Sequence, residues 1–135
     1  MLLIRLLCIS LNLVFIDLAH AATKNIIQAE WSMNTSATRQ PVEGMRGLLL
    51  DAMANGEAFG YLIGQHAESI KKAFKSDHPI LIDVLVIKNL DDDCKRLRIR
   101  NGQRQVWEIG AAKPLDRISE YQLDFCANGS LKWDK

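Results

Sequence analysis

The spacing of apolar residues predicts helices in the first half of the chain. One stripe with a helical period covers residues 45–53, and a second covers residues 59–74. Pro41 suits the first turn of a helix, and Asn55-Gly56 is typical of a helix end. We therefore expect two helices, joined by a short connection, within residues 42–76.

From Ile80 onward the pattern becomes that of β-strands. The first apolar run is β-branched and nearly continuous, which is typical of a strand covered on both faces. The next run alternates strictly and ends at Asn101-Gly102, the strongest two-residue hairpin signal in the chain. Within residues 80–133 four strands are expected, each followed by a turn or a loop: residues 80–87, 94–100, 104–109 and 118–126.

These patterns together predict an α+β fold, with two N-terminal helices packed on a small antiparallel sheet and one disulfide. A chain of 135 residues is short for two independent cores, so residues 42–135 are expected to form a single domain. Residues 22–41 show little periodicity and are interpreted as an N-terminal arm.

The first twenty-one residues have the pattern of a cleavable signal peptide. Arg5 precedes an apolar run at residues 6–16, and Ala19-His20-Ala21 places small residues where a signal peptidase requires them. The run is too short to cross a hydrocarbon core of roughly 30 Å, so a membrane anchor is the less favoured interpretation. We expect cleavage after Ala21, no stable membrane insertion afterwards, and a periplasmic or secreted mature protein.

Removal of residues 1–21 would leave two cysteines, Cys94 and Cys126. An even number of cysteines in an exported chain favours a disulfide. A metal pair or a catalytic thiol is less favoured, because neither cysteine lies in a C-x-x-C motif or near a histidine. If the disulfide joins antiparallel strands, the opposed pairs are Arg96 with Asp124, Arg98 with Gln122, Arg100 with Glu120, Leu97 with Leu123, and Ile99 with Tyr121.

Charge and titratable residues narrow the classes of function. There are 17 Lys and Arg against 16 Asp and Glu, so no broad basic surface is expected for a nucleic acid. His66 falls on the second apolar stripe and His78 in a helix-ending turn, without the spacing of a zinc site. We therefore expect no metal, no cofactor and no enzymatic activity, since these two histidines suggest no nucleophile–base pair.

The best candidate for a partner surface is the arginine row Arg96, Arg98 and Arg100, together with Trp107. Arginine and tryptophan are enriched at binding hot spots. A hairpin at Asn101-Gly102 would place Trp107 opposite Arg96, within cation–π range. An ordinary solvated surface is the alternative interpretation of this row.

Four short segments resemble a family of small exported proteins encoded among conjugative-transfer genes. They are residues 56–65, 79–84, 94–97 and 121–129, and they are similar to KikA-type proteins found beside type IV secretion clusters. Such relatives often continue the final Cys-x-x-Gly with prolines, whereas Ser130-Leu131-Lys132 follows here.

This resemblance implies a non-enzymatic accessory of plasmid transfer, with protein partners in the cell envelope. The alternative function is that of an immunity-type or inhibitor protein that binds an exported effector. Its surface would be the second helix and the arginine strand.

Overall fold

The computed structural model describes residues 31–91 and 93–132, so the expected signal peptide and the first part of the arm lie outside the described residues. Two helices and five strands follow one another in an interleaved order. They are β1 (Gln40–Val42), α2 (Met45–Asn55), β2 (Glu57–Leu62), α3 (Gly64–Phe74), β3 (Leu81–Asn89), β4 (Cys94–Val106) and β5 (Leu115–Cys126).

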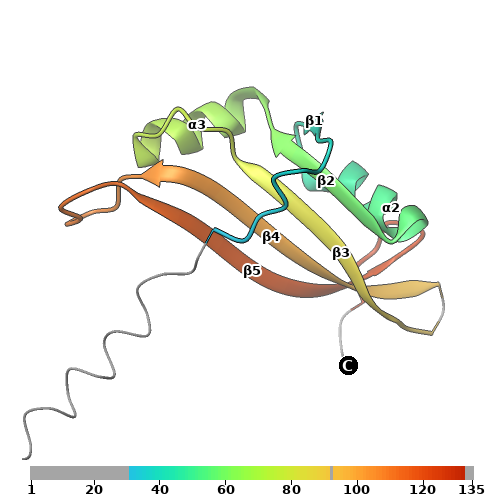
Figure 1. Cartoon of the computed structure of the whole chain (residues 1–135). Coiled ribbons are helices and arrows are strands. Elements are labelled where there is room, and N and C mark those ends of the chain that lie inside the picture. The colour runs from blue at the N-terminus through green and yellow to red at the C-terminus, as the bar shows by residue number, and fades with distance from the viewer. Residues whose placement is uncertain (1–30, 92, 133–135) are drawn as a thin grey trace, which may run out of the picture. The chain divides into compact units, whose positions relative to one another are not determined.

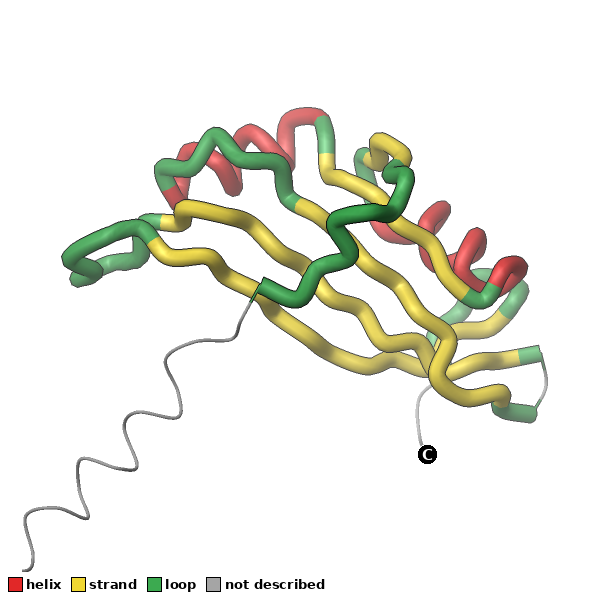
Figure 2. The backbone as a smooth tube through the Cα atoms, viewed as in Figure 1, coloured by secondary structure: helices red, strands yellow, loops and turns green. Residues whose placement is uncertain are grey.

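The strands form one sheet in the order β1-β2-β3-β4-β5. β1 and β2 are parallel and are connected through α2, while every later pair of neighbours is antiparallel. Both helices lie on one face of this sheet, and residues 31–39 cross the opposite face (Figures 1 and 2). The sheet therefore has a helix face and an arm face.

The expected fold class is wrong in two respects. The sheet is a five-stranded mixed sheet rather than a small antiparallel one, and strands precede and separate the helices. The second helix begins at Gly64, because residues 57–62 form β2 with alternating burial. Gly56 and Gly64 bracket β2 at φ values of 87° and 85°, which a continuous helix does not allow. The apolar residues from Phe59 to Leu62 therefore fit a strand as well as a helix.

The hairpin expected at Asn101-Gly102 is also wrong, because β4 continues through both residues. Gly102 pairs with Leu81 on one side and with Ile118 on the other. A Cβ atom at Gly102 would lie 2.7 Å from Cγ of Met33 in the arm. The glycine thus allows a close approach of the arm to the sheet rather than a tight turn, and the separate strand expected at 104–109 does not form.

The predicted pairing of the last two strands is confirmed. Cys94 and Cys126 form a disulfide, and β4 and β5 run antiparallel around it. All five side-chain pairs expected from that constraint are present: Arg96 with Asp124, Arg98 with Gln122, Arg100 with Glu120, Leu97 with Leu123, and Ile99 with Tyr121.

The core lies between α2 and the helix face of the sheet. The first helix is present as expected, and it buries Leu48, Leu49, Ala52 and Met53. Leu48 sits above Gly60 of β2, where an added Cβ would come within 3.3 Å of both leucine methyl groups. Complete burial of one such leucine is worth about 1.5–3 kcal/mol. Packing of this kind holds α2 on the sheet, whereas α3 has a single fully buried residue, Ala67.

Candidate functional site

A groove opens on the helix face of the sheet, beside α3. Its volume is about 690 Å³. Its apolar side chains come from both helices and from β2 to β4, and they include Met45, Leu62, Ile70, Phe74, Ile82 and Val106. Phe74 and Tyr121, which line the groove, are 41% and 43% exposed, so both side chains are accessible to solvent.

Two polar side chains of β4 reach the floor of the groove. Gln103 is buried, and its Nε2 donates to the backbone oxygens of Ser76 at 3.2 Å and His78 at 3.0 Å. Asn101 pairs with Ile82 and Ser119 in the sheet, and its Oδ1 is buried without a hydrogen-bond partner among the described residues. A buried amide oxygen without a donor costs about 1–3 kcal/mol.

Charged groups stand at the edge of the groove. Glu108 and Arg117 form an ion pair with each other. Glu43 and His66 also line the groove, and both are exposed. The Glu43 side chain lies near the start of α3, 3.6 Å from where a Cβ of Gly64 would be. The charges are therefore confined to the rim, while the interior is mostly apolar.

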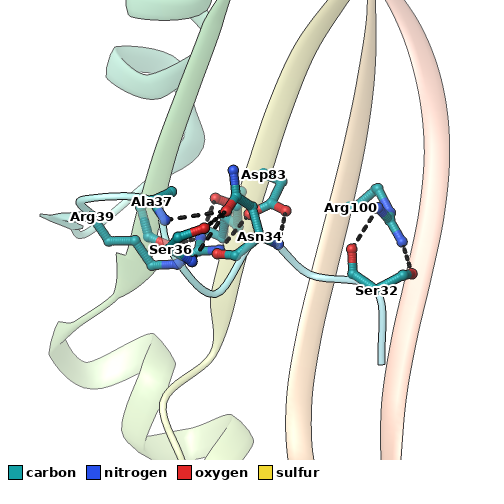
Figure 3. A network of polar contacts seen from close by, with 9 residues as sticks. Ser32, Asn34, Ser36, Ala37, Arg39, Asp83 and Arg100 are labelled. Atoms are coloured by element: carbon teal, nitrogen blue, oxygen red, sulfur yellow. Dashed lines mark hydrogen bonds and ion pairs between the residues drawn. The ribbon is translucent and has the colours of Figure 1, made fainter. Parts of the chain in front are cut away.

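On the opposite face, the arm is held to the sheet by polar contacts around Asp83 (Figure 3). Nη2 of Arg39 lies 2.7 Å from Oδ1 of Asp83 as an ion pair, and Asp83 Oδ2 accepts the backbone N–H of Asn34 at 3.0 Å. Nη1 of Arg39 also donates to the backbone oxygens of Gly60 and Ile82. The side chains of Arg39 and Asp83 are only 10% and 3% exposed, so the pair is nearly buried.

The three arginines of the predicted row lie side by side on the arm face, as their alternation with Leu97 and Ile99 predicts. Arg96 forms two hydrogen bonds to Asp124, at 2.7 and 3.0 Å. Arg100 lies 3.3 Å from Glu120 and donates to the backbone oxygen of Ser32 at 2.9 Å. Nε of Arg98 is buried without a hydrogen-bond partner in the described part of the chain. Contacts within the chain thus occupy two of the three arginines.

Trp107 is not part of that row. It follows the end of β4, and its backbone N–H donates to the oxygen of Phe74. Eleven residues of extended chain place it roughly 35 Å along the strand from Arg96. The expected cation–π pair with Arg96 is therefore wrong. An arginine–tryptophan contact does occur elsewhere, because the Arg104 guanidinium lies 4.2 Å from the ring centre of Trp31 in the arm.

The two histidines lie in different settings. His66 is exposed on α3 and lines the groove, whereas His78 follows the helix and its backbone oxygen accepts from Gln103. Within residues 31–91 and 93–132 there is no group of three or more His, Cys, Asp or Glu residues that could hold a metal ion. No helix in the same ranges is long and apolar enough to cross a membrane.

The spacing of apolar residues does not predict the groove. Its apolar wall has the spacing of an ordinary helix stripe, although Ile70 and Phe74 continue that stripe beyond the one alanine that the helix buries fully. Asn101 and Gln103 were the other available signal, since they are polar residues at positions that face inward if Leu97 and Ile99 do. The turn that Asn101-Gly102 predicts would have ended the strand before Gln103.

Comparisons with known proteins found no similar protein. The chain matched no protein-family model, no curated protein and no solved structure.

Proposed function

We propose that this chain is an exported, non-catalytic binding protein of the cell envelope, and that the groove beside α3 receives an apolar group of its ligand or partner. The observation that carries this proposal is the groove itself. Its volume of about 690 Å³ lies in the range of about 300–1,000 Å³ that is typical of ligand sites. The mostly apolar lining is suited to an apolar body.

Two further features support this function. The Cys94–Cys126 disulfide is of the kind that persists in oxidising compartments such as the periplasm, which supports export. Two charged residues that line the groove, Glu108 and Arg117, neutralise each other in an ion pair, which favours an uncharged body over an anionic substrate. The role we propose for the binding protein is accessory to conjugative transfer, in line with the resemblance to KikA-type proteins.

The groove is better supported as a binding site than the arginine row. Arg96 and Arg100 already form ion pairs with Asp124 and Glu120 on the same sheet. An inhibitor that used this row would have to compete with those contacts and with Ser32 of the arm. The arginine strand therefore gives the immunity-type function no specific support.

The proposal is tested with an apolar fluorescent probe, N-phenyl-1-naphthylamine, titrated into the purified protein. Saturable fluorescence enhancement is expected for the wild type. Phe74→Glu places a charge in the wall of the groove and should weaken binding at least tenfold. Ala73→Glu is the matched control, because Ala73 is the exposed neighbour on the same turn of α3 and does not line the groove.

Thermal unfolding of both variants separates loss of binding from loss of the fold. Phe74 is already 41% exposed, so we expect Phe74→Glu to stay folded. Absence of saturable binding by the wild type, or equal binding by the two glutamate variants, would refute the groove as the site. The accessory role is tested separately by the transfer frequency of a donor strain that lacks the gene, which should fall and should be restored by the wild-type gene.

A further inference from the structure

The two edges of the sheet differ in how they are protected. β1 forms one edge and has only three residues, with Pro41 at its centre. β5 forms the other edge and has twelve residues. Short edge strands and prolines block the addition of further strands, whereas a long regular edge invites it. The β5 edge is therefore the place where another strand can be added.

Part of the β5 edge is already covered by the end of the described chain. The N–H of Cys126 donates to the oxygen of Ser130, and the N–H of Lys132 donates to the oxygen of Asp124. Among the described residues no strand pairs with the remaining outer edge, Leu115–Leu123. That stretch contains no Pro, Gly or Lys, and it presents Leu115 at 37% and Tyr121 at 43% exposure.

We propose that a second copy of this chain pairs with this free edge, antiparallel and about a two-fold axis at Ser119. Because Asp124 and Cys126 direct their backbone groups outward, alternation places the outward groups of the free edge on residues 116, 118, 120 and 122. In an antiparallel partner, residue 118 would face residue 120 and residue 116 would face residue 122. The outward backbone N–H and C=O groups of all four residues would then be hydrogen-bonded in both copies.

The charged side chains of the edge favour this register over the registers with an axis at a neighbouring residue. An axis at Arg117 or at Glu120 would place that residue opposite its own copy, and an axis at Ile118 would place Asp116 opposite Glu120. Like charges that are directly opposed destabilise a strand pair. An axis at Tyr121 would run into the edge that residues 130–132 already cover. The axis at Ser119 opposes no like charges and uses the whole free edge.

The same register pairs complementary side chains on the helix face. Arg117 would lie opposite the partner's Tyr121, a cation–π pair that occurs twice by symmetry. Leu115 would lie opposite the partner's Leu123, which would cover the exposed leucine. Arg117, Ser119 and Tyr121 line the groove of their own chain. The partner's Tyr121 would therefore extend the wall of that groove.

Two lysine variants test the interface through charge. Ser119→Lys places two lysines against each other on the axis and should convert the dimer to a monomer in sedimentation velocity. Gln122→Lys is the matched control, because it adds the same charge to the same edge but faces the partner's Asp116, and the dimer should be kept. A wild type that stays monomeric at the highest attainable concentration, or a dimer that survives Ser119→Lys, would overturn the proposal.

Cysteine cross-linking tests the register directly, because Cys94 and Cys126 are already joined in a disulfide. Residue 119 faces its own copy in a non-hydrogen-bonded pair, where the Cα atoms approach to about 4.5 Å and a disulfide fits. Ser119→Cys should therefore give a covalent dimer under mild oxidation, whereas Gln122→Cys should not. Cross-linking of Gln122→Cys instead would refute this register. The groove is lined by residues of one chain, so binding of the probe does not require the dimer. A monomeric wild type that still binds the probe would overturn the dimer and leave the proposed function standing.

Discussion

Replacement of Asp83 by alanine tests how the N-terminal arm is held on the sheet. Asp83 is the third residue of β3, and its side chain is 3% exposed. It forms the ion pair with Arg39 at 2.7 Å and accepts the backbone N–H of Asn34 at 3.0 Å. Asp83→Ala removes both contacts at once and leaves the guanidinium of Arg39 without a counter-ion.

The size of the effect follows from what remains around Arg39. Loss of one partner of a buried ion pair typically costs about 3–5 kcal/mol, because the other charge stays buried and uncompensated. Arg39 keeps its backbone acceptors at Asn34, Gly60 and Ile82, and it lies 5.7 Å from the ring centre of Phe59. These contacts offset part of the penalty, so we expect the lower end, about 3 kcal/mol.

Urea denaturation followed by circular dichroism measures this loss as a lower midpoint with an unchanged slope. A double-mutant cycle with Arg39→Met isolates the ion pair, and the double variant should lose at least about 1 kcal/mol less than the sum of the single variants. Glu68→Ala is the control, since it breaks an exposed pair with Lys71 and should cost less than about 1 kcal/mol. A loss below about 1 kcal/mol for Asp83→Ala, or additive single losses, would refute this account of the arm.

Three further predictions concern separate parts of the molecule. Removal of the disulfide by Cys94→Ala with Cys126→Ala frees a loop of 32 residues and should lower the free energy of unfolding by about 3–4 kcal/mol in urea titrations; a loss below about 1 kcal/mol would contradict it. Gly47→Ala in α2 meets no atom within 4 Å and should stabilise the protein by about 0.5–1 kcal/mol, visible as a higher midpoint, whereas a lower midpoint would count against it. The hydrogen bond from Arg96 holds the pKa of Asp124 below its usual value, so this carboxylate stabilises the fold above that value, and the effect disappears as pH falls through the lowered pKa. The difference in unfolding free energy between the wild type and Asp124→Asn should therefore shrink towards acid pH, and a difference that does not depend on pH would contradict the assignment.

The sequence predicted the structure correctly where the local pattern of residues had one interpretation. The strict alternation after Cys94 and the parity of the two cysteines allowed only one antiparallel register, and the structure has that register. The helix at Met45–Asn55 was also expected, because its apolar stripe and its terminal glycine agree with each other. In both regions, local pattern and tertiary contacts favour the same structure.

The errors fall where one local signal fits two structures. Residues 57–62 match a helical stripe, yet pairing with β3 on one side and β1 on the other makes them a strand. Asn101-Gly102 matches a hairpin turn, yet the missing side chain of Gly102 makes room for Met33, and β4 continues. The interactions that decide between the two structures come from residues distant in sequence, and the local spacing of apolar residues cannot predict them.

The sequence by itself predicted the pairing of β4 with β5, the disulfide and the position of the first helix, because each depends on a periodicity or a parity in the spacing of residues along the chain. Only the tertiary structure decided the parallel β1–β2 pair, the groove beside α3 and the free edge of β5. A groove exists only between elements, and an edge is free only when no other element pairs with it. Both properties depend on how distant segments are arranged, so no local pattern in this chain could specify them.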